Sequence, residues 1–273
     1  MTSETAALPA HLSIEPGRLV FVGGLHRSGT TPLTRMLADH PQVAGLRSTG
    51  VEEDEGQHLQ SVYPIARTYG GAGRFALDRR AHLTEASAVR TDTTAEQLLR
   101  CWAPYWDLSR QFLVEKSPPN LIMGRFLQDL FPGSCLIVVL RNPVIVALST
   151  KKWARWTSLS ELVRHWFVAH QTLRDDAEWL DRLLVLRYED LVDEPCETLT
   201  RVASFLGLTG EIPHQSLDPR RSLPYVRRWE QMAHGGPVQR HRRRVIEDAF
   251  GDEMAGYGYS MRDLTRHTPW SWA

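Results

Sequence analysis

The stretch that decides the fold is Gly23-Gly24-Leu25-His26-Arg27-Ser28-Gly29-Thr30-Thr31. Residues 18–22, directly before it, form a short apolar run with β-branched and aromatic members, which is typical of a buried strand. After it, apolar residues recur at helical spacing over residues 30–40, and Pro41 ends the pattern. A strand, a glycine-bearing loop and a helix in this order make a turn that can hold a phosphate-like anion with backbone N–H groups and the helix N-terminus.

The glycine spacing of this loop, from Gly24 to Gly29, matches the nucleotide-binding pattern G-x-x-x-x-G-K-[ST]. Thr30 stands where that pattern has its lysine, and the only cation in the loop is Arg27. The loop is therefore predicted to bind an anion without being a standard ATP loop. A tight strand-to-helix turn with incidental glycines is the alternative interpretation.

The motif Arg27-Ser28-Gly29-Thr30-Thr31 resembles the 5′-phosphosulfate loop of sulfotransferases that use 3′-phosphoadenosine 5′-phosphosulfate (PAPS). The resemblance is strongest to the protein-tyrosine and carbohydrate sulfotransferases. It implies that these five residues bind the 5′-phosphate and the sulfonate of PAPS, and that Arg27 also stabilises charge during transfer.

Length and composition favour one domain. The chain has 273 residues, 42% of them hydrophobic, and a formal net charge of zero, which argues against a nucleic-acid partner. We expect a loose arm over residues 1–17, without signal-peptide features, and one domain over residues 18–273. The three widely spaced cysteines favour reduced thiols over a disulfide scaffold or a zinc site. A cytoplasmic protein without stable membrane insertion is expected, and nothing in the sequence indicates its oligomeric state.

An acidic cluster lies in the irregular, glycine-rich segment 41–81, where long loops tend to be functional. We predict that Glu55 removes the proton from an acceptor hydroxyl, with Glu53 and His58 as alternatives, because the resembling families place their base in the segment after the first helix. The position of the glutamate base in protein-tyrosine sulfotransferases falls on Ser48, so the role must move or be lost. A solvated acidic turn is the alternative interpretation.

Lys116 follows an apolar run at residues 112–114 that reads as a strand. It is one of only three lysines in a chain whose other basic side chains, apart from histidine, are arginines. This suggests that the function of this position requires a compact point charge. The carboxyl ends of parallel strands carry ligand sites in open sheets. The stretch also resembles a Lys-x-Pro segment whose lysine stabilises the sulfonate in transit. A solvated strand end is the alternative.

The strongest signal follows the most apolar run of the chain, residues 136–140, which predicts a central parallel strand. Arg141-Asn142-Pro143 comes directly after it, and Ser149 follows two helical turns later. This pattern resembles the 3′-phosphate site of PAPS enzymes, in which the arginine makes a charge-assisted contact and the serine donates a hydroxyl. Further helices are expected near residues 94–106 and over 120–131.

The later part of the chain contributes the rest of the resemblance. Tyr188, after an apolar strand at residues 183–186, matches a tyrosine placed near the adenine, and a helix over residues 194–206 follows. Arg228, or alternatively Arg227, matches a cofactor-binding lysine of a late loop. We expect Trp166 and Trp179, at helical spacing within residues 159–180, in the core, with ligand stacking as the alternative. Trp153 and Trp156 are candidates for the acceptor pocket, since aromatic faces suit sugars and phenols, and the sequence leaves open whether they contact the acceptor.

Together these elements predict an α/β fold: a single-domain open parallel sheet flanked by helices, of the P-loop-like sulfotransferase type. The resemblance implies transfer of the PAPS sulfonate to a hydroxyl of a small-molecule or glycoconjugate acceptor, with no metal. Two alternatives share the fold. One is a P-loop small-molecule kinase, and the other is a non-catalytic nucleotide-binding protein.

Overall fold

The computed structural model describes residues 14–214 and 217–270. Its centre is a five-stranded, wholly parallel sheet in the order β2-β3-β1-β4-β5. The strands are β1 (Leu19–Gly23), β2 (Val43–Gly45), β3 (Phe112–Lys116), β4 (Cys135–Leu140) and β5 (Leu183–Arg187). The expected open parallel sheet of α/β type is confirmed.

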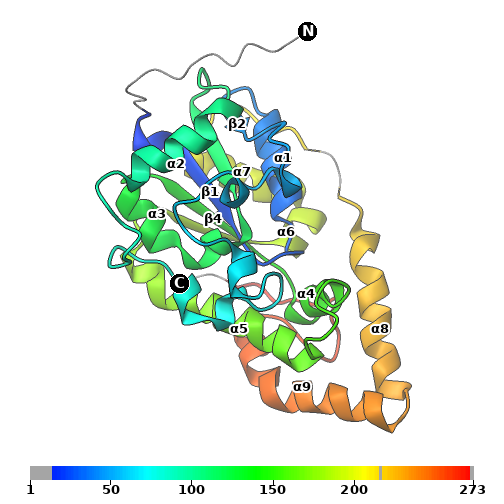
Figure 1. Cartoon of the computed structure of the whole chain (residues 1–273). Helices are drawn as coiled ribbons and strands as arrows, with labels where there is room; N and C mark the ends of the chain where they lie inside the picture. Colours follow the sequence, from blue (N-terminus) through cyan, green and yellow to red (C-terminus); the bar gives the residue numbers. More distant parts are fainter. Residues whose placement is uncertain (1–13, 215–216, 271–273) are drawn as a thin grey trace.

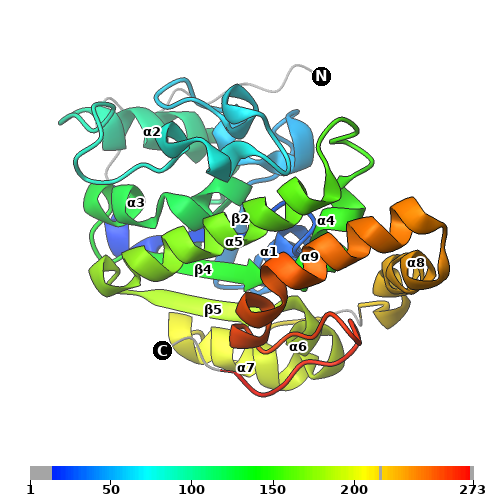
Figure 2. The ribbon, with the colours of Figure 1, turned by 90° about the horizontal axis from the view of Figure 1, so that it is seen from below.

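Helices cover both faces of the sheet (Figures 1 and 2). The α-helices are α1 (Thr30–Asp39), α2 (Thr94–Trp102), α3 (Gly124–Leu130), α4 (Pro143–Thr150), α5 (Leu159–Asp176), α6 (Tyr188–Asp193), α7 (Pro195–Leu206), α8 (Leu223–His234) and α9 (Pro237–Gly256). Successive strand residues point to opposite faces, so β1 contributes to two cores. Phe21 packs with residues of α2, α3 and α5, whereas Val20 and Val22 pack with residues of α1, α6 and α7.

The elements around the glycine loop agree with the sequence pattern. β1 and α1 flank it, and the expected helix end near Pro41 is confirmed because α1 closes at Asp39. The helix predicted over residues 194–206 is α7, and Gly207 ends it in the left-handed conformation at φ 74°. All three cysteines are free, as expected.

Three expectations differ from the structure. The segment 41–81 contains the short strand β2, which the sequence pattern missed. The helix expected over residues 120–131 is a 3-10 turn at Pro118–Ile122 followed by α3, because Met123 leaves helical geometry at φ −125°. Trp179 is 62% exposed, not in the core, because it lies beyond the end of α5, where the helical register no longer turns it inward. Its ring contacts the guanidinium of Arg125 instead.

The expected N-terminal arm falls mostly on residues 1–13, outside the described residues. Ile14 is buried against the core and Pro16–Arg18 form a 3-10 turn, so packing begins a few residues before β1. At the other end, α8 and α9 follow each other at a wide angle in Figure 1, α8 in gold and α9 in orange, and α9 packs against α5. Within the described parts of the chain, no helix combines the length and apolar character needed to cross a membrane.

Candidate active site

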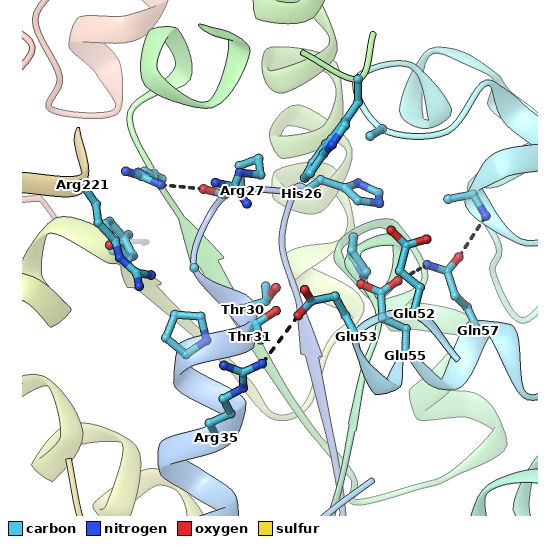
Figure 3. A pocket seen from close by; sticks show the side chains of 18 of the residues that line it. His26, Arg27, Thr30, Thr31, Arg35, Glu52, Glu53, Glu55, Gln57 and Arg221 are labelled. Carbon is cyan, nitrogen blue, oxygen red and sulfur yellow. Dashed lines mark hydrogen bonds and ion pairs between the residues drawn. The ribbon is translucent and has the colours of Figure 1, made fainter. Parts of the chain in front are cut away.

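A cavity of about 920 Å³ opens at the carboxyl end of the sheet. Its wall includes residues that lie within a few positions of the ends of four strands: the loop after β1, Pro118 after β3, Arg141 after β4 and Tyr188 after β5. The segment between β2 and α2 supplies the opposite side with Glu52, Glu53, Glu55, Gln57, His58 and Arg67. Figure 3 shows the loop and these acidic residues facing one another across the cavity.

The glycine loop is built so that its backbone and small side chains face this cavity. Gly29 takes φ 104°, and a Cβ there would collide with the Tyr188 ring. Ser28 donates its N–H to the Leu25 carbonyl at 2.9 Å, while its buried Oγ has no partner among the described residues. Arg27 takes the left-handed conformation at φ 75°, which is uncommon for a residue with a Cβ. Because Gly29 caps α1 without a side-chain bond, the first N–H groups of that helix are available to an anion.

Arg141 joins the loop to the later part of the chain. It is 6% exposed, and its guanidinium lies 4.2 Å from the centre of the Tyr188 ring. It donates to the carbonyl of Arg27 at 2.9 Å and to Ser222 Oγ at 2.8 Å, while its buried Nε has no partner in the described residues. Burial lowers the pKa of Arg141, and the neighbouring Tyr188 and Glu189 oppose that shift. These hydrogen bonds go to neutral oxygens, so the buried charge can still bind an anion.

Three of the predicted nucleotide residues lie outside the wall of this cavity: Ser28, which is fully buried in the loop, Ser149 and Arg228. Ser149 is buried in α4, and its Oγ donates to the Val146 carbonyl of its own helix at 3.3 Å. Arg228 is exposed on α8, as is the alternative Arg227. Arg221 lies in the wall instead, one residue before the Ser222 that Arg141 contacts. The sequence pattern missed Arg221 because it belongs to a 3-10 turn at Pro219–Ser222, which has no periodic signal.

Glu55 and Lys116 form a buried ion pair. Lys116 Nζ lies 3.0 Å from Glu55 Oε1, and the two residues are 3% and 6% exposed. The second carboxylate oxygen of Glu55 accepts a hydrogen bond of 2.6 Å from Gln57 Nε2 and lies 3.6 Å from His58 Nε2. The ion pair therefore brings together the two residues to which the sequence analysis gave the base and the sulfonate contact.

Glu53 is more exposed to solvent than Glu55. It takes the left-handed conformation at φ 54° and pairs with Arg35 of α1 at 4.0 Å, a contact visible in Figure 3. Both residues also line a second cavity of about 560 Å³, to which Lys116 contributes. Ser48 is exposed and lines neither cavity. A group entering from the Arg35 side therefore meets Glu53 before it reaches the buried Glu55–Lys116 pair.

His26 is a cavity residue that the sequence analysis missed. Its ring packs edge-on against the buried Phe75, and its Nδ1 is buried without a partner in the described part of the chain. Burial lowers the pKa of His26, with Glu55 opposing and Lys116 reinforcing the shift. The imidazole is thus kept neutral beside the acidic segment. The sequence did contain a signal for His26, since this residue stands next to Arg27 in a loop predicted to bind an anion.

Comparison with known proteins decides the family. A model described as "Sulfotransferase family" matches residues 19–211. The chain belongs to this family. A curated relative, protein-tyrosine sulfotransferase of Drosophila melanogaster, is 26% identical over 201 residues, which cover 70% of this chain and 38% of the relative. Protein-tyrosine sulfotransferase 2 of Gallus gallus is 24% identical over 204 residues, covering 70% of this chain and 51% of its own length.

A solved structure supports the fold. The sulfotransferase STF1 of Mycobacterium tuberculosis H37Rv superimposes with a TM-score of 0.50 at 16% identity, covering 86% of this chain and 76% of that protein. The chain spans between about two fifths and about half of the length of the curated relatives it matches. Sulfotransferase membership agrees with Thr30 at the lysine position of the loop and disfavours the kinase alternative.

The two tryptophans expected at the acceptor pocket differ in position. Trp153 is 54% exposed, lines the larger cavity and has the Arg27 guanidinium 5.2 Å from its ring centre. Trp156 is 99% exposed and is not in the wall. Among the described residues, no group of three or more histidine, cysteine or acidic side chains is placed to hold a metal ion.

Proposed function

We propose that this sulfotransferase-family protein transfers the sulfonate of PAPS to a hydroxyl of a polar small-molecule or glycoconjugate acceptor. The observation that carries the proposal is the convergence on one cavity of the anion-binding loop, the buried Arg141 and the Glu55 of the Glu55–Lys116 pair. An anion site and a paired carboxylate within one cavity are what transfer of a charged group to a hydroxyl requires.

The residues fit PAPS. Ser28 Oγ and Arg141 Nε are buried without partners in the described chain, so both can serve an anionic ligand at little further desolvation cost. We assign the 5′ end to residues 27–31, the 3′-phosphate to Arg141 with Arg221, and the adenine to the Tyr188 side of the cavity. Ser149 would join the 3′-phosphate site by turning its hydroxyl away from its own helix, and Arg228 would have to approach from the exposed face of α8.

PAPS supplies an activated sulfonate with a phosphate leaving group. The role we assign to Glu55 is to accept the proton of the attacking hydroxyl, with Glu53 and His58 as the neighbours that could take its place. When Glu55 becomes neutral, its attraction for Lys116 falls, and the ammonium becomes available to the charge on the transferring group. Arg27 and the loop N–H groups stabilise the same charge from the other side of the site.

The acceptor side of the cavity supports a polar acceptor. It is lined by Glu52, Glu53, His58, Arg35 and Arg67 together with alanine and glycine, and Met36 and Leu217 are the large aliphatic side chains that the described residues contribute to the whole wall. Charged and amide groups there suit a ligand rich in hydroxyls, since an apolar ligand would desolvate them without replacing their hydrogen bonds. Trp153 adds one aromatic face at the rim.

Nucleotide titration and turnover test this proposal. The protein is titrated with 3′,5′-adenosine diphosphate (PAP) and, separately, with ATP plus Mg²⁺, and is then incubated with PAPS and matched panels of hydroxyl-rich and apolar acceptors. We expect PAP binding without comparable ATP binding, and sulfonation within the hydroxyl-rich panel. PAP binding without turnover on either panel would instead support the non-catalytic alternative, and preferential ATP binding would support the kinase.

A further inference from the structure

Glu115 is a buried carboxylate next to Lys116 that the proposed transfer does not use. It is 1% exposed and lies in β3 opposite Phe21 of β1. Since neighbouring strand residues point to opposite faces, Glu115 projects to the face of Leu113, which packs with α2, α3 and α5, whereas Lys116 projects to the face that packs with α1. Gly56, the residue after Glu55, lies against the Glu115 carboxylate.

The hydrogen bonds of Glu115 lead to Glu55 in three steps. Its Oε1 accepts from Ser117 Oγ at 2.6 Å, and Ser117 Oγ in turn accepts the backbone N–H of Gln57 at 2.9 Å. The side chain of Gln57 then donates to Glu55 Oε2 at 2.6 Å. The other oxygen of Glu115 accepts from Asn120 Nδ2 at 2.6 Å. Both carboxylate oxygens are thus engaged, and one of them supports the segment that carries the proposed base.

Residues 55–57 also pack closely against Glu115. A Cβ placed at Gly56 would lie 2.5 Å from Glu115 Oε1, so only glycine allows this approach. On the other side, the indole of the buried Trp102 donates to the Gly56 carbonyl at 3.0 Å. The backbone between Glu55 and Gln57 is therefore fixed by one contact with Glu115 and one with Trp102.

The pKa of Glu115 depends on burial, on its hydrogen bonds and on the charges of Glu55 and Lys116. Burial raises the pKa of Glu115 to about 7, while hydrogen bonds from Ser117 and Asn120 lower it; Glu55 adds to the increase, and Lys116 opposes it. The buried Tyr63 is a further titratable neighbour: burial raises its pKa, and Glu115 contributes to the increase. A carboxylate that only filled space in this core would be poorly suited to it, since an apolar side chain carries no desolvation penalty.

We propose that Glu115 is a positioning residue for the transfer, which through Ser117 and Gln57 determines where the Glu55 carboxylate stands. The inference rests on the proposed function for its catalytic consequence, but its structural part is independent of it. Removing the support should loosen residues 55–57 and misplace the base, without changing the loop or Arg141, which bind the nucleotide in our proposal.

The test compares Ser117→Ala and Glu115→Gln with Gly251→Ala, a control at a half-buried α9 position where an added Cβ meets open space. NMR hydrogen exchange of the Gln57 amide is measured in each, together with PAP affinity by calorimetry. We expect at least tenfold faster exchange in Ser117→Ala, because the Gln57 N–H loses its acceptor, and a smaller increase in Glu115→Gln. PAP affinity should stay within about twofold of wild type in all variants.

Kinetics supply the functional readout on an acceptor that the wild-type protein sulfonates. Both variants should lower kcat at least tenfold with KM for PAPS little changed, and Glu115→Gln should remove a step near pH 7 from the kcat profile. Unchanged Gln57 exchange in Glu115→Gln would overturn the positioning role, whether or not the protein is a sulfotransferase. Faster exchange with unchanged kcat would overturn its link to catalysis. If Glu115→Gln does not fold, Glu115→Asp, whose shorter side chain withdraws from Ser117 Oγ, carries the same test.

Discussion

Replacing Lys116 by alanine tests the buried ion pair at the centre of the site. Glu55 is 6% exposed beside Lys116, and the substitution leaves it with Gln57 as its remaining close hydrogen-bond donor and His58 at 3.6 Å. Removing one partner of a buried pair typically costs about 3 to 5 kcal/mol, because the other charge stays desolvated and unpaired. The cavities beside both residues admit water, so we expect the lower end, about 3 kcal/mol of unfolding free energy.

The same variant should be far more impaired in turnover than in nucleotide binding. A preorganised charge on a transferring group contributes roughly 3 kcal/mol, or about a hundredfold in rate. Lys116 lines the second cavity, away from Arg141 and Tyr188, so PAP affinity should change by less than about threefold.

Urea denaturation, PAP calorimetry and single-turnover rates measure these three quantities. A double variant, Lys116→Met with Glu55→Gln, removes both charges and keeps the size of both side chains. It should be less destabilised than Lys116→Ala, since no buried charge remains unpaired. A loss of less than 1 kcal/mol in Lys116→Ala, or a turnover rate close to wild type, would refute the reasoning about this pair.

Three further predictions follow from the site. Arg141→Ala should weaken PAP binding in calorimetry by about 2 kcal/mol or more while AMP binding is little changed, with Arg242→Ala, at an exposed position of α9, as the matched control; equal losses for PAP and AMP would exclude a 3′-phosphate contact. Glu55→Gln should abolish turnover while PAP still binds, because the amide keeps the shape and loses the proton acceptor; an active Glu55→Gln with an inactive His58→Ala would move the base to His58. The pKa of Glu115 is raised to about 7 from an ordinary value of 4.5, so proton binding favours the folded state. This stabilisation is complete below about pH 4.5 and is lost as the pH rises through about 7, so urea denaturation at pH 5 and pH 8 should show an alkaline loss of up to about 3 kcal/mol that Glu115→Gln lacks; the same loss in both proteins would contradict the origin of the effect.

The parts of the fold that were predictable have strong local patterns. The apolar runs of β1, β4 and β5 and the glycine loop follow from side-chain type alone. Strand β2 was missed because it has only three residues, including an alanine and a glycine, and it exists through its pairing with β3. Trp179 was misassigned because periodicity extends smoothly past the point where α5 ends.

Part of the cavity wall was predicted from the sequence, but its arrangement was not, and the roles given to its residues stay predictions. Glu55 and Lys116 were named from separate local cues, yet they lie 61 positions apart, and only the folded sheet brings them to 3.0 Å. Glu115 carried a usable signal: two adjacent charges in a buried strand must point to opposite faces, so both need partners inside the protein. Arg221 had no such signal, because it reaches the cavity through an irregular segment.

The most direct test of sulfonate transfer is a single-turnover reaction with ³⁵S-labelled PAPS bound to excess protein, followed by addition of a hydroxyl-rich acceptor. Our account predicts that one label appears on the acceptor for each PAP formed in the wild-type protein, and that Glu55→Gln binds the nucleotide but leaves the label on PAPS. Label recovered as inorganic sulfate, or transferred equally well by Glu55→Gln, would contradict it.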